Sequence, residues 1–391
     1  MSQEFHDALI RSKRQSWIFI LCFTLLLGGF VASLLLAWSD GAMTRSTQNG
    51  WKDFAHGAPM RALAEDLRQT PLANWLGRKQ RELGWLALDD LGPRVSAGCP
   101  GWLFLNDELT VHPDGAHQAE ARARIVQEIH HDLRTRGSQL LVVLVPDKSR
   151  VEAAHGCALP RSPRLEARYE DWKNRLDAAG IPWVDLLPVL TQVHQNTGAA
   201  FDRSDTHWNI DGARAAADAT ARELKNLGFA PATPIHFKID IGTPQARWGD
   251  LVRLAGLEQL PESWRPAPDT VPLVNITSQA PDAAELGADA LFGDSQDSRV
   301  TLAGTSFSRN AHFADFLAAA LNAEVGNLAR DGGGFARSMR DVLEQEQRAS
   351  QPTPWVIWEI PERMLQEPLT AEEESLRRLL KTGATAPVPT M

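Results

Sequence analysis

Three residues of this chain have the types and spacing that nucleophilic catalysis needs. Asp205 and His207 lie two positions apart, and Asn209 follows as a good N-cap for an alanine-rich helix. The carboxylate and the imidazole are therefore expected on a loop that a helix holds in place. A histidine that activates a nucleophile needs a carboxylate to fix its tautomer and stabilise the imidazolium. The nucleophile must come from elsewhere in the chain, and the best candidate is Ser306.

Ser306 follows a pattern that is typical of a nucleophile turn. Residues 299–304 read as a short buried strand that ends in glycine, and residues 310–321 carry apolar side chains at helical spacing. A strand, a sharp turn with a small residue, a serine and a helix together lift a serine hydroxyl out at the end of a sheet. Backbone N–H groups at the start of such a helix can face a developing oxyanion.

Two simpler interpretations compete with this one. An Asp-x-His pair in a loop is more often a helix cap or a surface salt bridge than a catalytic pair. A second serine, Ser295, lies in a Gly-Asp-Ser sequence that resembles the motif of GDSL esterases. No helical pattern follows Ser295, so the strand and helix around Ser306 favour that residue as the nucleophile.

Strands and helices alternate along most of the chain, which predicts an α/β domain with a largely parallel sheet. The expected strands are 101–105, 138–146, 182–186, 299–304, 323–329 and 354–360, and the expected helices are 118–136, 165–179, 209–227, 310–321 and 335–347. Residues 228–298 are rich in Pro, Asp and Ala, and we expect an irregular insertion there. The domain is expected to span residues 98–382, between a lead-in at 39–97 and a disordered tail at 383–391.

One stretch is long and apolar enough to span a bilayer. Residues 17–38 carry no charge and have a tryptophan at each end, as expected of a retained transmembrane anchor with aromatic residues at both interfaces. Arg11, Lys13 and Arg14 precede it closely, whereas the basic residues on the other side are more widely spaced. The positive-inside rule therefore predicts that residues 1–16 are cytoplasmic and that the rest of the chain is exported.

The cysteines and the net charge bear on disulfide formation, metal binding and nucleic-acid binding. Of the three cysteines, Cys22 lies in the predicted anchor, which leaves Cys99 and Cys157 as a plausible disulfide in an oxidising compartment or as two free thiols. No group of residues has the spacing of zinc ligands, and we expect no metal or cofactor. The net charge of −9 argues against a nucleic-acid partner.

Six stretches, taken in order, resemble the SGNH-like acetyltransferases of the alginate O-acetyltransferase AlgJ/AlgX type. They are Gly101-Trp-Leu-Phe-Leu105, Val145-Pro-Asp-Lys-Ser-Arg150, Asp205-Thr-His-Trp208, Gly249-Asp-Leu251, Gly304-Thr-Ser-Phe-Ser308 and Trp358-Glu-Ile-Pro-Glu-Arg363. The resemblance runs from about residue 98 to 365. It implies an SGNH-hydrolase-like three-layer fold, with Ser306 as nucleophile, His207 as general base and Asp205 as its orienting carboxylate. Asp-x-His then precedes the serine, the reverse of the order in ordinary SGNH hydrolases.

The same resemblance implies a function and a location. Ser306 would accept an acetyl group and pass it to a hydroxyl of an exopolysaccharide, with a membrane-bound O-acyltransferase as the donor partner. The chain would be a single-pass protein of a bacterial inner membrane with its catalytic domain in the periplasm. An esterase or deacetylase of the same fold, or a non-catalytic scaffold in polysaccharide biosynthesis, remains an alternative. Because alginate is a polyanion and this chain is acidic, a neutral glucan-type acceptor also stays open.

Several further residues are candidates for binding substrate or the oxyanion. The Ser306 backbone N–H is expected in the oxyanion hole, and Asn327 and the glycines at 332–334 are candidates that could equally form a turn. Lys148 is a candidate substrate contact or part of a loop that leaves the sheet. Trp208 either stacks on a sugar or packs under the His207 loop. Phe307 occupies a position where this family usually has tyrosine, so any help from that phenol is missing here.

Overall fold

The computed structural model describes residues 70–157, 159–279, 299–349 and 351–383, together with residue 68 and scattered positions between 17 and 32. The chain forms two compact units, Met1–Asp90 and Leu91–Met391. The predicted cytoplasmic tail, most of the predicted anchor and the residues after 383 lie outside the described part. Among the described residues, none of the helices is both long and apolar enough to cross a membrane.

The first unit contains the helix α4 (Pro71–Leu88). Thr70 caps its N-terminus, since the threonine hydroxyl oxygen accepts a hydrogen bond from the Ala73 N–H at 3.4 Å, and a proline follows at the first helical position. Asp89 ends the helix in the left-handed conformation. The second unit begins at Leu91, earlier than the expected start of the compact domain at residue 98.

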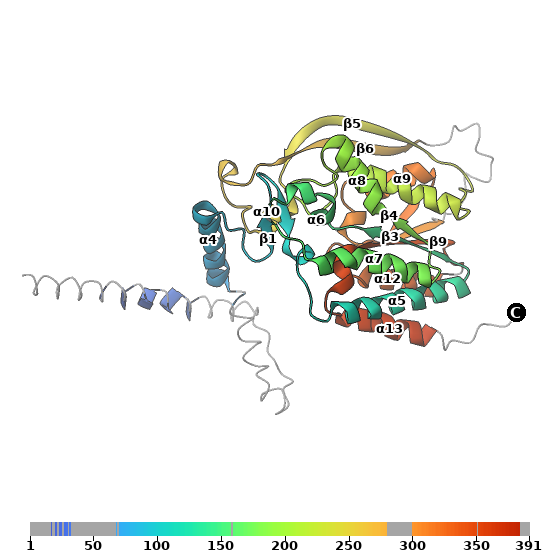
Figure 1. Ribbon diagram of the computed structural model, residues 1–391, viewed down its shortest axis with the longest axis horizontal. Coiled ribbons are helices and arrows are strands. Elements are labelled where there is room, and N and C mark those ends of the chain that lie inside the picture. Colours follow the sequence, from blue (N-terminus) through green and yellow to red (C-terminus); the bar gives the residue numbers. More distant parts are fainter. Residues whose placement is uncertain are drawn as a thin grey trace, which may run out of the picture. The chain divides into compact units, whose positions relative to one another are not determined.

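A parallel sheet forms the centre of the second unit (Figure 1). In the described part of the chain it has five strands, all parallel, in the order β4-β3-β9-β7-β8. Their bounds are β3 (Gln139–Val145), β4 (Trp183–Asp185), β7 (Val300–Ala303), β8 (Val325–Asn327) and β9 (Trp355–Pro361). The predicted mostly parallel α/β fold is confirmed. The carboxyl ends of parallel strands share one edge, and ligands of such folds bind there.

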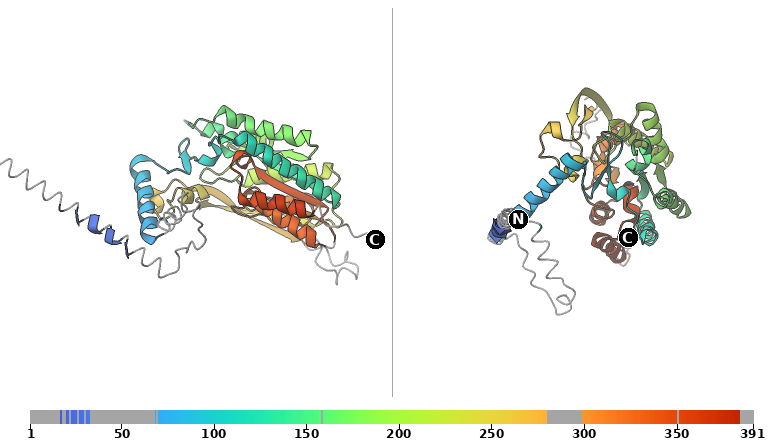
Figure 2. Two further views of the ribbon diagram at one scale, coloured as in Figure 1. Left: turned by 90° about the horizontal axis from the view of Figure 1, so that it is seen from below. Right: turned by 60° about the vertical axis from the view of Figure 1, so that its left-hand side comes forward.

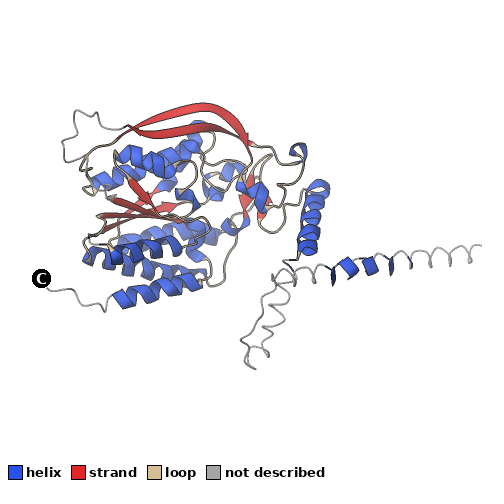
Figure 3. Ribbon diagram, turned by 180° about the vertical axis from the view of Figure 1, so that it is seen from behind, coloured by secondary structure: helices blue, strands red, loops and turns tan. Residues whose placement is uncertain are grey.

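Helices cover both faces of the sheet, as Figures 2 and 3 show. One face packs against α5 (Gly115–Thr135), α7 (Pro163–Ala178) and α12 (Arg337–Arg348). Helix α13 (Ala371–Gly383) packs on the outer side of α5 and α12. The other face packs against α8 (Leu186–Thr197), α9 (Ile210–Asn226) and α11 (Phe313–Leu321). Alternate residues of β3 point into the two cores, with Leu141 and Val143 in one and Leu140 and Val142 in the other. The result is the expected three-layer arrangement.

The region at 228–298 corrects one prediction. It was expected to be irregular, but β5 (His236–Arg247) and β6 (Asp269–Gln279) pair as a long antiparallel ribbon that lies over the α8 and α9 face (Figure 1). Ile239 and Val274 lie on the inner side of the ribbon and pack against that core. Beyond β5 the short helix α10 (Asp250–Leu254) and a 3-10 turn (Glu262–Trp264) lead into β6. Residues 280–298, with Ser295, lie outside the described residues.

A small antiparallel pair precedes the main sheet. Strands β1 (Val95–Ala97) and β2 (Leu103–Leu105) are joined by a turn in which Gly101 has a φ of +85°, a conformation that favours glycine. The same turn contains Cys99, which forms a disulfide with Cys157. The 3-10 turn η1 (Asn106–Glu108), helix α6 (Lys148–Val151), η2 (Ala153–His155) and η6 (Glu362–Gln366) complete this end of the unit.

Candidate active site

Ser306 lies in a tight turn at the carboxyl end of β7. The strand ends at Ala303, and the 3-10 turn η5 (Ser306–Ser308) begins after Gly304 and Thr305. A Cβ at Gly304 would lie 2.4 Å from Ser308 Oγ and 2.6 Å from Glu359 Oε2, so only glycine fits this approach. Helix α11 begins at residue 313 rather than at 310, because Ala311 and His312 adopt positive φ and interrupt the helix.

A buried carboxylate in the neighbouring strand stabilises this turn through hydrogen bonds. Glu359, in β9, accepts hydrogen bonds from the Thr305 N–H at 2.7 Å and from the Ser308 hydroxyl at 3.0 Å. The Thr305 hydroxyl also donates to it at 3.0 Å. Burial raises the pKa of Glu359 above its ordinary value, although these donors oppose the shift. From the sequence, Glu359 was expected in a structural ion pair with Arg363 and not in the site, yet a lone charge inside an otherwise apolar strand was a signal for this role.

The loop that carries Asp205 and His207 is fixed at both ends. Phe201 and Trp208 form an isolated antiparallel bridge across its base. Asn209 then caps α9, as predicted, because its Oδ1 accepts the Gly212 N–H at 2.8 Å. The loop between these points lies against the carboxyl end of the sheet, beside the Ser306 turn.

The three predicted side chains form one hydrogen-bonded series. His207 Nδ1 lies 2.6 Å from Asp205 Oδ1, and the His207 backbone N–H donates to the same oxygen at 3.0 Å. The Ser306 Oγ lies 2.7 Å from His207 Nε2. A carboxylate, an imidazole and a hydroxyl in this order allow the ring to accept the hydroxyl proton while the carboxylate stabilises the imidazolium.

The electrostatics of Asp205 suit this arrangement. Burial alone would raise its pKa, but the hydrogen bonds and charge of His207 outweigh burial, and Arg247, 4.0 Å away, acts in the same direction. The pKa of Asp205 is therefore held below its ordinary value, and the group stays a carboxylate throughout the neutral range.

A second carboxylate, Asp250 at the start of α10, supports the loop. It accepts hydrogen bonds from the Thr206 N–H at 2.8 Å and the Thr206 hydroxyl at 2.7 Å, and its own N–H donates to Asp205 at 3.2 Å. Burial and the nearby charge of Asp205 raise the pKa of Asp250. Asp205, His207 and Asp250 place their ligand atoms within 4.8 Å of one another. Both nitrogens of His207 are already engaged, however, and this fits proton transfer better than metal binding.

Lys148 occupies a different place from the one considered in the sequence. It is 1% exposed, so it cannot touch a substrate from that position. Its Nζ donates to four backbone carbonyl oxygens, at 2.7 to 3.0 Å, those of Leu103, Asp202, Arg203 and Asp205. Burial lowers the pKa of Lys148 to about 8, against the opposing charges of Glu108 and Asp205. The ammonium group thus holds together the backbone carbonyls of the loop that carries Asp205.

None of the other candidates is shown to face the reacting groups: Trp208 and Phe307 are buried, and Asn327 and Gly332 are exposed. Trp208 is fully buried against Phe307 and Phe313, and the Phe307 ring lies edge-on to His207 with centroids 5.0 Å apart. Both rings therefore support the His207 loop from beneath. Asn327 donates to the Ser308 carbonyl at 3.0 Å and closes a turn. Gly332 and Gly334 have positive φ, as expected of turn residues.

Sequence analysis missed Asn310, which the structure brings to the site. Its Nδ2 donates to the Ser306 carbonyl at 2.9 Å and lies 3.5 Å from His207 Nε2. This side-chain amide thus contacts both the backbone of Ser306 and the ring nitrogen that faces the Ser306 hydroxyl. An asparagine directly after the nucleophile turn was the available signal, but the expected helix start at this position concealed it.

Comparison with known proteins decides the family. The protein family described as "SGNH hydrolase-like domain, acetyltransferase AlgX" matches residues 95–362, which is more than half of the chain. The chain belongs to this family. The match begins at β1 and ends in the turn after β9, so it contains the whole sheet and all three side chains of the hydrogen-bonded series.

Several known proteins are similar to about two thirds to three quarters of this chain. The probable alginate O-acetylase AlgJ of Pseudomonas aeruginosa is 33% identical over 293 residues, 72% of this chain and 74% of that protein. The alginate biosynthesis protein AlgX of Pseudomonas syringae pv. tomato is 29% identical over 270 residues, 66% of this chain and 53% of that protein. The solved O-acetyltransferase domain of Pseudomonas putida AlgJ has a TM-score of 0.63 at 25% identity, and covers 74% of this chain and 99% of that one.

Two cavities of this domain lie at different distances from the hydrogen-bonded series. One of about 250 Å³ is lined by residues of the β5–β6 ribbon, by Ile210 and by Ala311 and His312, and includes Arg247. It therefore borders both the His207 loop and the Ser306 turn.

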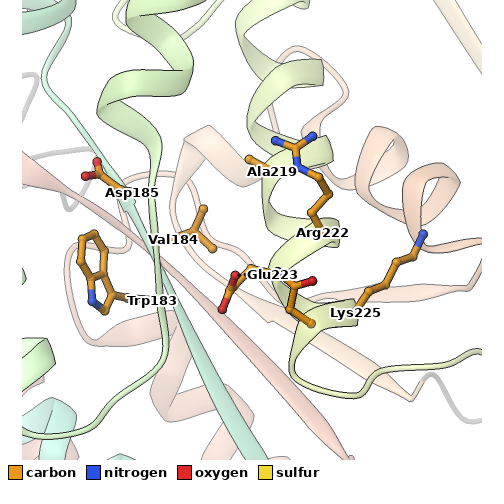
Figure 4. Close-up of a pocket in the computed structure, with 8 residues that line it drawn as sticks. Trp183, Val184, Asp185, Ala219, Arg222, Glu223 and Lys225 are labelled. Atoms are coloured by element: carbon orange, nitrogen blue, oxygen red, sulfur yellow. Dashed lines mark hydrogen bonds between the residues drawn. The ribbon is translucent and has the colours of Figure 1, made fainter.

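A larger cavity of about 440 Å³ lies between β4 and the second half of α9, where Figure 4 shows Trp183, Asp185, Arg222 and Lys225 around it. Its first lining residue on α9, Ala219, is about 14 Å along the helix from Ile210 at 1.5 Å per residue. This larger cavity is remote from the hydrogen-bonded series, whereas the smaller one is lined by residues that lie close to His207 and Ser306 in the sequence.

Proposed function

We propose that the chain is a membrane-anchored, periplasmic O-acetyltransferase that transfers acetyl groups through Ser306 to hydroxyls of an exopolysaccharide of the alginate type. The observation that carries the proposal is the unbroken series from Asp205 through His207 to Ser306 at the carboxyl end of a parallel sheet. Membership of the acetyltransferase family and the naming of the relatives as alginate O-acetylases support the reaction and the acceptor.

The first half-reaction acetylates the serine. His207 Nε2 accepts the proton of the Ser306 hydroxyl as Oγ attacks the carbonyl carbon of the acetyl donor. The oxyanion of the tetrahedral intermediate accepts hydrogen bonds from the Ser306 N–H and from the Asn310 amide, whose Nδ2 lies 3.5 Å from the reacting imidazole. As the intermediate collapses, His207 returns the proton to the leaving group. A membrane-bound O-acyltransferase partner supplies the acetyl group in this proposal.

The second half-reaction transfers the acetyl group. A sugar hydroxyl gives its proton to His207 as its oxygen attacks the acetyl carbon, and the Ser306 oxygen leaves and recovers that proton. Asp205 remains ionised in both steps, because His207 holds its pKa below the ordinary value. The free hydroxyl of Ser306 is thereby regenerated.

The acceptor is placed in the cavity beside the ribbon. Arg247 lines this cavity and is about half exposed while it also pairs with Asp202 at 2.8 Å. Arg309, in the same turn as Ser306, is exposed, and His312 lines the cavity from the other side. Arg309 and His312 also pair with carboxylates, Asp331 at 3.3 Å and Asp315 at 3.0 Å, so a polyuronate would have to compete with these partners for the basic groups.

The location rests on the N-terminal segment and on the disulfide. The anchor is proposed at residues 17–38, and the large apolar side chains described there are exposed, with Trp17 at 70% and Leu25 at 67%. Such exposed apolar side chains suit lipid better than water. The disulfide between Cys99 and Cys157 suits an oxidising compartment such as the periplasm.

The proposal is tested with the full-length chain in detergent, given a chromogenic acetyl ester with and without alginate oligosaccharides. Mass spectrometry follows acetyl groups on both protein and sugar. We expect acetylated sugar only when enzyme, ester and oligosaccharide are all present. Release of acetate to water alone, unchanged by the sugar, would show a hydrolase instead. Neutral glucan oligosaccharides in a parallel reaction test the acceptor class.

Replacing Lys148 should disrupt the site without touching a reactant. Lys148→Met shortens the side chain by only one atom but leaves four carbonyls without their donor, and an unsatisfied buried polar group costs roughly 1–3 kcal/mol. A shift of about 1 Å in a catalytic group can lower a rate about 100-fold, and we expect a loss of that order in Ser306 acetylation. Lys225→Met is the control, because Lys225 donates to a single carbonyl at the surface. A folded Lys148→Met enzyme with the wild-type rate would contradict this role.

The same lysine predicts an alkaline limit of activity. Below pH 8 the ammonium group is protonated and has three N–H donors for its four carbonyls, and above its pKa of about 8 one donor is lost. The rate of Ser306 acetylation should therefore fall as the pH rises through about 8. Single-turnover acetylation measured from neutral to alkaline pH, corrected for uncatalysed ester hydrolysis, tests this. A rate that stays constant well above pH 8 would show that Lys148 keeps its proton.

A further inference from the structure

A second cluster of titratable side chains lies outside the catalytic series. Glu152 follows α6, His155 ends η2 and His194 lies in the last turn of α8. The Oε2 atom of Glu152 lies 2.6 Å from His194 Nδ1 and 3.0 Å from His155 Nδ1. One atom from each of the three residues thus converges within 4.8 Å of the others. The proposed acetyl transfer uses none of these groups.

The three ligand atoms are held in place by their surroundings. Glu152 is fully buried, and its other oxygen, Oε1, accepts the backbone N–H groups of Ala200 at 2.6 Å and Phe201 at 3.2 Å. The His155 ring stacks on Trp102, with centroids 3.9 Å apart and planes 9° apart. Metal ligands are commonly oriented by such outer partners, which fix the direction of the coordinating atom. Here they leave Glu152 Oε2 and the two Nδ1 atoms turned toward one another.

The cluster is also accessible. The His155 and His194 side chains are 28% and 20% exposed, so an ion can reach them and a water molecule can complete its coordination. Two imidazoles with one carboxylate are the donor set of open zinc sites. Metal–ligand distances of about 2.0–2.1 Å in a tetrahedron separate ligands by roughly 3.3 Å. The two Nδ1 atoms now lie 2.6 and 3.0 Å from Glu152 Oε2, so each would have to move away from this oxygen by less than about 1 Å to make room for the ion.

We propose that Glu152, His155 and His194 bind one divalent transition-metal ion with the preferences of Zn²⁺. The ion replaces the two Nδ1 protons, and each imidazole then carries its proton on Nε2, which a partly exposed ring tolerates. This inference goes beyond the proposed acetyl transfer and does not depend on it.

The position of the site indicates a structural role. Glu152 binds the ion through Oε2 and the backbone of Ala200 and Phe201 through Oε1. Phe201 forms the bridge with Trp208, next to His207. An ion at this point would therefore tie α8 and η2 to the base of the loop that carries Asp205 and His207. Binding to the folded chain alone would stabilise it by mass action.

The test uses the full-length chain, stripped with a chelator and titrated near neutral pH. Co²⁺ is followed by its ligand-field absorption and Zn²⁺ by calorimetry, with unfolding temperature as a second measurement. We expect one ion per chain and a higher unfolding temperature with Zn²⁺. Loss of a residue that only orients a metal ligand lowers metal affinity by up to about 100-fold. Loss of a ligand itself should cost more, so His155→Ala and His194→Ala should each weaken Zn²⁺ binding by more than about 100-fold.

His312→Ala is the matched control, since His312 also pairs with a carboxylate, Asp315, at 3.0 Å but has no second imidazole. This variant should bind Zn²⁺ as the wild type does. Circular dichroism shows whether each variant folds, and both cluster histidines are exposed enough that the alanine variants should do so. The absence of a stoichiometric ion in the wild type would overturn the proposal and leave a purely hydrogen-bonded cluster. Unchanged binding in a folded variant lacking both His155 and His194 would equally overturn it.

Discussion

Ser306→Ala should abolish acetyl transfer and leave the fold intact. The loss of rate is expected on the order of 10⁶-fold, by analogy with removal of the serine from serine hydrolases. The fold should survive because the Ser306 hydroxyl contacts His207 Nε2 at 2.7 Å, whereas the turn itself is held by Glu359 through Thr305 and Ser308. Intact-protein mass spectrometry after reaction with an acetyl ester detects the acetylated serine, and thermal unfolding reports the fold.

Ser308→Ala is the matched control for this experiment. Ser308 lies in the same turn, but its hydroxyl donates to Glu359 at 3.0 Å instead of facing His207. Loss of that hydrogen bond should cost roughly 1–3 kcal/mol of stability, because the acceptor is buried. Acetylation of Ser306 should persist in the variant. If Ser306→Ala still became acetylated, or if Ser308→Ala alone removed acetylation from a folded protein, the assignment of the nucleophile would be wrong.

Asp205→Asn should produce the second largest loss, on the order of 10⁴-fold, by analogy with serine proteases. The amide keeps the size of the side chain, but it favours the wrong tautomer of His207 and cannot stabilise the imidazolium. The short contact of 2.6 Å between His207 Nδ1 and Asp205 Oδ1 is the interaction that the substitution changes. Single-turnover acetylation of Ser306 measures the effect.

Asp250→Asn separates the roles of the two carboxylates. Asp250 lies 4.0 Å from His207 Nδ1 and binds mainly Thr206, whereas Asp205 contacts the same nitrogen at 2.6 Å. Its replacement should cost far less than that of Asp205. Near-normal activity in Asp205→Asn, or equal losses in the two variants, would remove Asp205 from its place as the orienting carboxylate.

The catalytic candidates were predictable because their signals are local. Asp205, His207 and the cap Asn209 lie within five positions, and the strand before Ser306 is mostly apolar and ends in glycine. The alternation of strands and helices likewise predicted the parallel sheet, because each element carries its own period. Local patterns of this kind do not require knowledge of which segments meet in space.

The contacts that support the site could not be predicted in the same way. Lys148 looked like a loop residue, and its role depends on carbonyls from two other segments, which meet only in the folded chain. Glu359 reaches the Ser306 turn from the neighbouring strand β9, and the sequence does not state that β7 and β9 are adjacent.

The β5–β6 ribbon was hidden for a local reason. Pro244 and Pro272 lie opposite each other at an irregularity of the pairing, and prolines inside a run weaken the interpretation of that run as a strand. The alternation in residues 236–241 was present, but it is short, and the partner strand lies more than twenty residues further on. A hairpin with a long connection lacks the turn signature that identifies a short one.

The most direct test of the central claim is a pulse–chase measurement on the full-length chain. The protein is acetylated briefly with an isotopically labelled acetyl ester, freed of excess ester and divided between buffer and alginate oligosaccharides. We predict that the label is first found on the Ser306 peptide, and that it then appears on sugar faster than it is lost to water. Label on another residue, or loss from Ser306 to water at a rate that the sugar does not change, would contradict the account.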